Sequence, residues 1–312
     1  MATMKAVRVH EYGGPEVLRY EDAPRPEAGP GEVLIRVHAA AINPVDIAVR
    51  AGFFKERIKY PLPMIPGWDV SGVVEAVGPG VSRLKVGDEV YSRPDLGRNG
   101  SYAEYIAVKE SEVALKPKSI DHMHAAAIPL AALTAWQALF DAGKLSGGQT
   151  VLIHGAAGGV GSFAVQFARI KGARVIGTAS QRNHDFLRSL GADQTIDYNT
   201  TKFETVVHDV DMVLDCITGE TADRSYGVIK NGGIYVSILM PPSAEKAAAH
   251  GVRTAHVFVQ PNTEQLGEIA KLVDSGKLKI TLEKVFPLAD ARAAQELNAT
   301  KHTRGKIVLR VL

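Results

Sequence analysis

The chain has 312 residues, more than one hydrophobic core usually serves, so two domains of ordinary size are expected. Hydrophobic residues make up 46% of it and charged residues 22%, as in ordinary soluble globular proteins. The basic and acidic residues are scattered and leave a net charge of +2, so there is no electrostatic basis for binding nucleic acid. Cys216 is the single cysteine, which excludes an internal disulfide and a multi-cysteine structural zinc site and suits a reducing compartment.

The start of the chain and its hydropathy predict a cytoplasmic protein that does not associate with membranes. Strand-like alternation begins at Met4, with no basic and apolar segments of a signal peptide before it. No uncharged apolar run approaches the length of a membrane span.

Residues 4–120 have the pattern of a compact β module, barrel-like or sandwich-like, with one short helix at 44–51. Glycine and proline separate its short apolar segments. The predicted strands are 5–10, 33–38, 70–77, 89–91 and 102–108.

The composition changes near residue 120, where an alanine- and leucine-rich stretch, 121–143, predicts helix that connects two modules. From 150 to 259 apolar strands alternate with helical segments, which is typical of a parallel, doubly wound sheet. The predicted strands there are 151–154, 174–178, 194–196, 212–215 and 234–238, and the helices between them include 186–190 and 221–229. Helices at 263–275 and 288–300 and a strand at 306–311 follow, and we expect this tail to return to the first module.

A glycine turn joins the strand at 151–154 to a helix at 162–170. Its residues, 156–161, fit A-x-G-x-x-G, a variant of the dinucleotide-binding fingerprint, in the strand–turn–helix context that such a fingerprint requires. Small residues let the backbone approach a pyrophosphate, and the N-terminus of the helix offers free N–H groups. The alternative is a tight turn without a ligand. The predicted cofactor-binding residues of the turn are Ala157, Gly158, Gly159 and Val160.

The end of the second strand of this module indicates which dinucleotide is bound. An acidic residue at this position usually holds the ribose 2′-hydroxyl of NAD, but here Ala179 is followed by Ser180 and Arg182. A hydroxyl and a guanidinium can donate charge-assisted hydrogen bonds to a 2′-phosphate, which predicts NADPH. The alternative is that Arg182 is a solvated residue in the first turn of the next helix.

These features together resemble the medium-chain dehydrogenase/reductase superfamily, specifically its zinc-free quinone oxidoreductase (zeta-crystallin-like) branch, over essentially the whole chain. The motifs that carry the resemblance are MKAV (4–7), GGPEVL (13–18), AINPVD (41–46), PGWDVSG (66–72), VGDEV (86–90), LTAW (133–136), the glycine turn and GKIVL (305–309). The resemblance implies an α/β protein with a GroES-like β-rich catalytic domain, 1–122 completed by 262–312, and an inserted Rossmann domain, 123–261. It also implies a homodimer, formed by edge strands of the Rossmann sheets near 257–259.

The resemblance also assigns individual residues. It implies that Asn43 lies at the nicotinamide ribose or carboxamide, that Thr134 lies near the nicotinamide, and that Tyr198 lies beside the adenosine 2′-phosphate. A turn residue before Pro44 is the alternative for Asn43. The aromatic residues Phe53, Phe54 and Trp68 are expected either to line an apolar substrate pocket, Phe54 and Trp68 foremost, or to be core residues.

No metal site is expected. Asn43 and Trp68 stand where the zinc alcohol dehydrogenases of the superfamily have a cysteine and a histidine, and neither side chain replaces those ligands. The lobe that carries four cysteines in those enzymes is also absent. His122 and His124 form the one close histidine pair, which we interpret as exposed residues at a helix start.

Without a metal, hydride transfer should favour activated acceptors, namely quinones or α,β-unsaturated carbonyls. The proton donor is not identified, because Ala48 occupies the position where several relatives have a tyrosine; Asn43 and Tyr91 are the remaining catalytic candidates. Cys216 lacks a basic neighbour in sequence and is not expected to be a nucleophile. The alternative function is an NADPH-binding protein with little turnover, in a structural or regulatory role.

Overall fold

The computed structural model describes residues 2–312, and the chain divides into two compact units. Unit 1 comprises Met1–Leu130, Pro261–Gly276 and Ile280–Leu312, and unit 2 comprises Ala131–Gln260 and Lys277–Lys279. The tail after residue 260 therefore belongs almost entirely to the unit formed by the first 130 residues.

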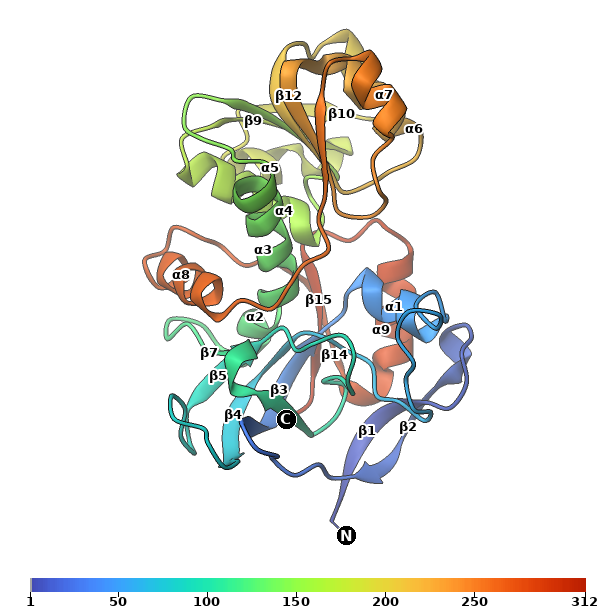
Figure 1. The fold of residues 1–312 in the computed structure, drawn as a ribbon, viewed down its shortest axis with the longest axis vertical. Coiled ribbons are helices and arrows are strands. Elements are labelled where there is room, and N and C mark those ends of the chain that lie inside the picture. The colour runs from blue at the N-terminus through green and yellow to red at the C-terminus, as the bar shows by residue number, and fades with distance from the viewer. Residues whose placement is uncertain (1) are drawn as a thin grey trace. The chain divides into compact units, whose positions relative to one another are not determined.

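Unit 1 contains a seven-stranded sheet and a separate two-stranded hairpin (Figure 1). Its strands are β1 (Thr3–Val9), β2 (Leu18–Pro24), β3 (Glu32–Ala41), β4 (Val70–Val77), β5 (Glu89–Ser92), β6 (Tyr105–Lys109), β7 (Val113–Leu115), β14 (Leu282–Pro287) and β15 (Lys306–Arg310). The large sheet has the order β14-β15-β3-β4-β5-β7, with β6 also paired to β3, and β1 pairs with β2 in the hairpin. The predicted β-rich module is thus confirmed, and β15 places the C-terminal tail inside its sheet.

Three strands of unit 1 were not predicted, and the predicted start of a fourth lies before its observed start. The segments that form β2, β7 and β14 carry charged residues or are very short, so they lack the apolar alternation that identifies a strand. The strand predicted at 102–108 begins at Tyr105, because Ala103 forms an isolated bridge with Ala6 instead.

The helices of unit 1 are α1 (Pro44–Arg50), α2 (His122–Ala126), α8 (Thr263–Asp274) and α9 (Ala291–Ala299). Buried aliphatic residues of β3, β4 and β5, Val33, Ile35, Val70, Val74 and Val90 among them, form one core cluster. A second cluster joins β1 and β15 to α9, which buries Ala291 and Ala294. The predicted helix at 288–300 is a short 3₁₀ turn, Leu288–Asp290, that leads into α9.

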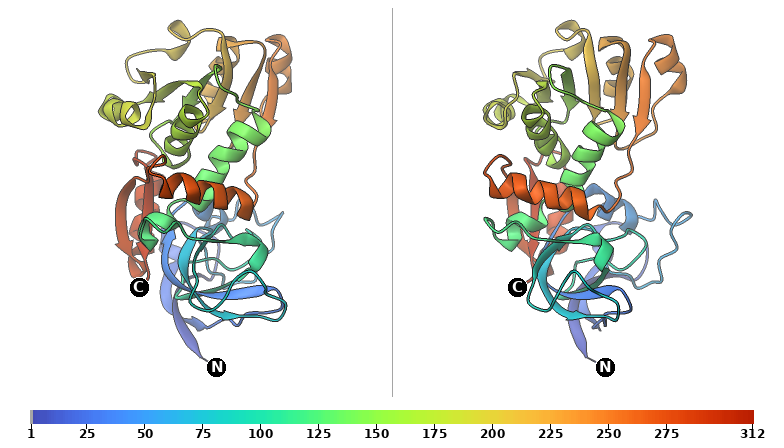
Figure 2. Two further views of the ribbon diagram at one scale, coloured as in Figure 1. Left: turned by 90° about the vertical axis from the view of Figure 1, so that its left-hand side faces the viewer. Right: turned by 60° about the vertical axis from the view of Figure 1, so that its left-hand side comes forward.

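Unit 2 is a six-stranded parallel sheet with the order β10-β9-β8-β11-β12-β13. The strands are β8 (Thr150–His154), β9 (Arg174–Ala179), β10 (Gln194–Asp197), β11 (Val210–Asp215), β12 (Ile229–Ser237) and β13 (Arg253–His256), and the main helices are α4 (Gly159–Ile170), α5 (His184–Leu190), α6 (Glu220–Ser225) and α7 (Ala244–Ala249). The strand order reverses after β10, so the crossovers place helices on both faces of the sheet (Figure 2). The predicted doubly wound fold is confirmed.

Two boundaries in unit 2 differ from prediction because glycines interrupt a strand. The helix predicted at 221–229 ends at Ser225, a 3₁₀ turn follows at Tyr226–Val228, and β12 begins at Ile229. Gly232, with a φ of +74°, lies inside β12, and the strand predicted at 234–238 covers only the part of β12 that follows it.

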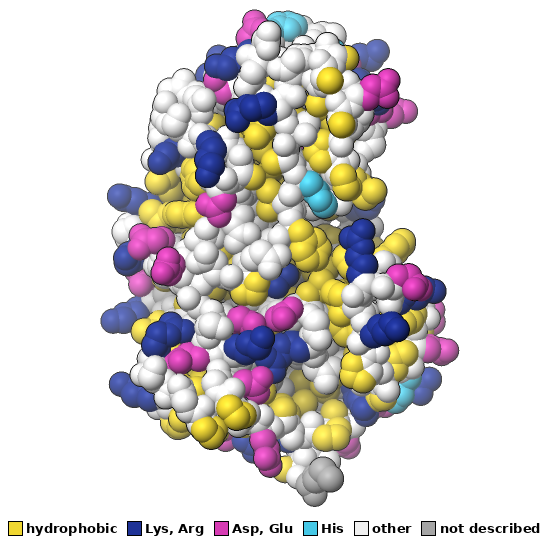
Figure 3. Space-filling model, in the orientation of Figure 1, with side chains coloured by type: hydrophobic (Ala, Val, Ile, Leu, Met, Phe, Trp, Pro, Cys, Tyr) yellow, Lys and Arg dark blue, Asp and Glu magenta, His cyan; other side chains and the backbone are white. Residues whose placement is uncertain are grey.

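The helical stretch predicted at 121–143 consists of three pieces, namely α2, α3 (Pro129–Trp136) and a π-helical turn, Gln137–Ala142. Pro129 has no N–H to continue a preceding helix, so a new helix starts there. None of the described helices has both the length and the apolar character needed to cross a membrane. Acidic and basic side chains are interspersed over the face drawn in Figure 3.

Candidate functional site: a glycine turn and a buried polar network

The glycine turn lies at the carboxyl end of β8, a central strand of unit 2 that pairs with both β9 and β11. Gly155 has a φ of +68°, a conformation that a side chain disfavours. A Cβ built on Gly161 would lie 2.3 Å from the carbonyl oxygen of Gly155 and 2.6 Å from Cα of Ala156. The helix can therefore start this close to the strand only with glycine at position 161.

The N-terminus of α4 offers hydrogen-bond donors to an anion. A helix leaves its first N–H groups without carbonyl partners, and in α4 these belong to Gly159, Val160 and Gly161. Gly158 is the N-cap and has no side chain to accept from them. Of the predicted turn residues, Ala157 is buried, whereas Gly158, Gly159 and Val160 are half-buried. This glycine-lined, donor-rich turn fits the pyrophosphate of a dinucleotide.

Ser180, Arg182 and Tyr198 lie on neighbouring chain segments. The parallel register pairs Asp197, the last residue of β10, with Ala179, the last of β9, so Ser180 and Tyr198 leave adjacent strands at the same edge. Arg182 follows in an exposed 3₁₀ turn, and Tyr198 is 54% exposed. The Asp197 carboxylate accepts hydrogen bonds from its own turn, at the backbone and side-chain nitrogens of Asn199.

His154, the residue before the turn, is a buried polar group that its place in an apolar strand did not predict. Its Nδ1 lies 3.1 Å from Thr178 Oγ1, and its Nε2 lies 3.0 Å from Ser225 Oγ. The Ser225 hydroxyl donates to the carbonyl oxygen of Thr221, so it accepts from His154, which assigns the proton of a neutral imidazole to Nε2. Burial lowers the pKa of His154 to about 4. The histidine thus joins β8 to β9 and α6 as a neutral bridge.

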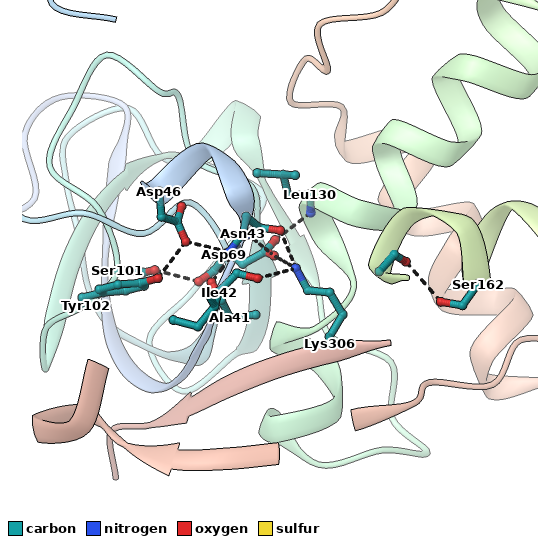
Figure 4. A network of polar contacts seen from close by, with 11 residues as sticks. Ala41, Ile42, Asn43, Asp46, Asp69, Ser101, Tyr102, Leu130, Ser162 and Lys306 are labelled. Atoms are coloured by element: carbon teal, nitrogen blue, oxygen red, sulfur yellow. Dashed lines mark hydrogen bonds and ion pairs between the residues drawn. The ribbon is translucent and has the colours of Figure 1, made fainter. Parts of the chain in front are cut away.

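In unit 1, Asn43 is the centre of a buried hydrogen-bond network (Figure 4). It is the N-cap of α1, and its Nδ2 donates to Asp69 Oδ2 at 2.8 Å. Lys306 Nζ donates to Asn43 Oδ1, to the carbonyl oxygen of Ile42 at 3.1 Å and to Asp69 Oδ2 at 3.2 Å. Oδ1 of Asp69 accepts from the backbone N–H of Leu130 at 2.6 Å. The sequence predicted Asn43 but neither Asp69 nor Lys306; a lysine within the otherwise apolar motif GKIVL was the available signal.

The Asp46 carboxylate extends this network. Its Oδ2 accepts from the backbone N–H of Asn43 at 2.8 Å and from the Tyr102 hydroxyl at 2.7 Å. Its Oδ1 is buried and has no hydrogen-bond partner among the described residues. Burial raises the pKa of Asp46 to about 7, against the opposing effect of both hydrogen bonds.

Asp46→Asn is expected to change how stability depends on pH. The folded protein holds the Asp46 proton up to a pH of about 7, whereas the unfolded chain releases it near 3.8. The stabilisation is therefore complete below pH 3.8 and is lost as the pH rises through 7, with a magnitude on the order of 4 kcal/mol. An asparagine mimics the protonated acid, so in urea unfolding the variant should match the wild type below pH 3.8, gain on it progressively between pH 3.8 and 7, and exceed it by the full amount at pH 8. Asp95→Asn, at an exposed position, should leave the pH profile unchanged, and equal stabilities of Asp46→Asn and the wild type at pH 8 would contradict the shift.

The remaining predicted residues are mostly packed. Trp68 has no exposed surface, and its indole N–H lacks a hydrogen-bond partner among the described residues. The Tyr91 hydroxyl is buried and donates to the carbonyl oxygen of Leu266 at 2.6 Å, an arrangement typical of a packing residue. Thr134 is buried on α3, and Phe54 is half-buried.

Cys216 directly follows β11 in unit 2. Burial raises the pKa of its thiol above the ordinary value, with the neighbouring Asp215 carboxylate acting in the same direction. A thiol in these surroundings stays protonated at neutral pH and is a poor nucleophile.

Comparison with known proteins places this geometry in a family. Residues 29–118 match the family model described as "Alcohol dehydrogenase GroES-like domain", and residues 190–309 match the one described as "Zinc-binding dehydrogenase". The NADPH-dependent alkenal/one oxidoreductase of Arabidopsis thaliana chloroplasts is 39% identical over 98% of this chain and 79% of its own length.

Two solved structures share the fold. The quinone oxidoreductase from Coxiella burnetii superposes with a TM-score of 0.93 at 37% identity, covering 100% of both chains. A mycobacterial protein solved in complex with NADPH superposes with a TM-score of 0.88 at 32% identity, covering 99% of this chain and 100% of its own. The GroES-like module and the doubly wound sheet predicted from the motifs are thus those of this family, and the chain belongs to the quinone oxidoreductase branch of the medium-chain dehydrogenase/reductase superfamily.

Proposed function

We propose that this chain is an NADPH-dependent reductase that transfers hydride to a quinone or an α,β-unsaturated carbonyl without zinc. The observation that carries the proposal is the pair of nucleotide-binding features in unit 2, namely the donor-rich glycine turn and the carboxylate-free end of β9. Relatives named as an NADPH-dependent alkenal/one oxidoreductase and a quinone oxidoreductase support the acceptor classes.

The cofactor is assigned to residues by the part that each can recognise. Gly158, Gly159 and Val160 surround the pyrophosphate, with the free N–H groups of Gly159 and Val160 as its donors, and Ser180, Arg182 and Tyr198 surround the adenosine 2′-phosphate. By family resemblance, Asn43 and Thr134 serve the nicotinamide end. When bound, NADPH supplies the hydride, and the residues named here orient and retain the cofactor.

The chemistry of two residues in unit 1 supports the zinc independence of the proposal. The Asn43 amide is already engaged by Asp69 and Lys306, and the Trp68 indole has no lone pair to give to a metal. The described residues contain no group of three histidine, cysteine, aspartate or glutamate side chains arranged to hold a metal ion. An enzyme with these residues needs an acceptor that is already activated, which favours quinones and enones over simple alcohols.

A homodimer is part of the proposal. The edge strand expected near 257–259 lies earlier in the chain: β13, Arg253–His256, forms one edge of the unit 2 sheet, and edge strands offer unpaired backbone groups to a second copy. Gel filtration with light scattering measures the molar mass in solution. A monomeric mass would contradict the proposed dimer and would leave the proposed enzymatic activity unaffected.

The activity test measures NADPH binding and oxidation separately. NADPH consumption at 340 nm is followed with naphthoquinones, short 2-alkenals and cyclic enones, before and after stripping metals with a chelator. The proposal expects tight NADPH binding and chelator-insensitive oxidation that at least one acceptor class accelerates. Tight binding without acceptor-dependent oxidation would support the alternative of a binding protein with little turnover, which Ala48 in place of a tyrosine also favours.

Arg182→Ala is expected to weaken NADPH binding about 10- to 100-fold, because a charge-assisted hydrogen bond to the 2′-phosphate is lost. NADH lacks that phosphate, so its affinity should change less than about twofold. Isothermal titration with both dinucleotides measures the difference. Arg188→Ala on α5, which removes an exposed ion pair with Asp185, serves as the matched control. Equal losses of affinity for NADPH and NADH would contradict the assignment of Arg182 to the 2′-phosphate.

A further inference from the structure

We propose that Lys306 and Asp69 are positioning residues that hold the Asn43 amide in a single orientation for the nicotinamide end of the cofactor. The inference rests on the proposed function, because it deepens the role given there to Asn43. It adds two residues that touch Asn43 rather than the cofactor.

The three side chains form a closed triangle of hydrogen bonds (Figure 4). Asn43 Nδ2 donates to Asp69 Oδ2, Lys306 Nζ donates to Asn43 Oδ1, and Lys306 Nζ also donates to Asp69 Oδ2. They come from the start of α1, the residue before β4 and the first residue of β15. Each is at least 95% buried. The triangle is therefore fixed by three elements of unit 1 and shielded from water.

The opposite charges of Lys306 and Asp69 determine the orientation of the Asn43 amide. A flipped Asn43 would turn Oδ1 toward the Asp69 carboxylate, an acceptor against an acceptor. It would also turn Nδ2 toward the Lys306 ammonium, a donor against a donor. An amide is otherwise free to choose either orientation, because its two ends differ only in hydrogen-bond character. Here a flip loses two charge-assisted bonds and creates two repulsive contacts.

Lys306 and Asp69 have little capacity left for any other role. The three N–H groups of Lys306 have three acceptors, in Ile42, Asn43 and Asp69. Both oxygens of Asp69 accept bonds, Oδ1 from the backbone of Leu130 and Oδ2 from the triangle. The second Nδ2 hydrogen of Asn43 makes only a long hydrogen bond, to the Ala41 carbonyl oxygen at 3.5 Å. Asn43 is therefore the member of the triangle with a weak hydrogen bond that an acceptor on a ligand can replace.

Stability alone is a poor reason for such a triangle. A buried ion pair gains about as much from attraction as it loses from desolvation, so apolar residues of similar volume often serve a fold equally well. Fixing one orientation of an amide, in contrast, requires a donor on one side and an acceptor on the other. Lys306 and Asp69 provide that combination.

A double-mutant cycle on NADPH affinity tests the inference. Asn43→Ala and Lys306→Met should each weaken NADPH binding about 10-fold, the loss of one well-placed hydrogen bond. The double variant should bind no more weakly than Asn43→Ala alone, because Lys306 acts through the amide that is already gone. Lys306→Arg, which retains the cation, should recover most of the affinity. Binding is measured by titration calorimetry and folding by thermal melting, so neither readout depends on turnover.

Each outcome separates the inference from the proposed function. If the wild type does not bind NADPH, the proposed function is wrong. If the wild type binds NADPH but the two losses multiply in the double variant, or Asn43→Ala has no effect, the positioning role is overturned and the proposed function stands. Lys109→Met, at an exposed position on β6, should change neither affinity nor melting temperature. If Lys306→Met does not fold, Lys306→Gln, which keeps one N–H for Asn43, replaces it in the same cycle.

Discussion

Gly161→Ala is expected to lower the free energy of unfolding by about 3 kcal/mol or more and to weaken NADPH binding at least about 100-fold. The added Cβ would lie 2.3 Å from the Gly155 carbonyl oxygen and 2.6 Å from Cα of Ala156. Both are backbone atoms of the same turn, so no flexible side chain can move aside. Relief requires α4 to shift away from β8, which removes its N-terminal N–H groups from the anion that they are proposed to hold. Urea unfolding and NADPH titration measure the two effects.

Alanine substitutions of two other glycines serve as controls. They distinguish the steric clash at position 161 from the general effect of replacing a glycine. Gly158→Ala places its Cβ 3.4 Å from the nearest atom at a φ of −76°, so it should fold normally and affect mainly cofactor binding. Gly267→Ala lies inside α8 with no atom within 4 Å, and should stabilise the chain by about 0.5–1 kcal/mol without affecting NADPH. If Gly161→Ala has the same melting temperature as the wild type, the close approach of α4 to β8 does not require glycine at position 161.

The doubly wound sheet could be predicted because its signals are local. Buried parallel strands are short apolar runs, and the turn before α4 needs glycine for reasons that involve neighbouring residues only. The edge strands β2, β7 and β14 lacked that signal, since their pairing partners rather than their own sequences make them strands.

The network around Asn43 could be predicted only in part, because its members are far apart in the chain. Lys306 and Asp69 are separated by 237 positions, and β15 brings them together by pairing with β3. A lysine in a strand is normally interpreted as a solvated residue, and only the register of β15 shows that this one is buried. His154 was missed for the same reason, since Thr178 and Ser225 reach it from other elements.

Asp69→Asn is expected to lower the free energy of unfolding by about 3–5 kcal/mol, although the two side chains have the same shape. Asp69 accepts hydrogen bonds on both oxygens, Oδ1 from the Leu130 backbone and Oδ2 from Asn43 and Lys306. An asparagine has one oxygen, so in either orientation its NH₂ group faces a donor. The substitution also leaves the Lys306 ammonium buried without a countercharge.

The same experiment distinguishes a lost countercharge from a lost contact. Asp69→Asn combined with Lys306→Met removes the buried cation as well, so the double variant should regain stability relative to Asp69→Asn alone, by about 2 kcal/mol in urea unfolding. Asp22→Asn is the matched control, because Asp22 pairs with Lys5 at 3.0 Å on the surface, where an ion pair contributes little. If the losses of the two single variants simply add in the double variant, Lys306 and Asp69 do not compensate each other's charge. The triangle would then be three separate contacts instead of one electrostatic unit, and the orientation of Asn43 would have to come from the fold of α1 alone.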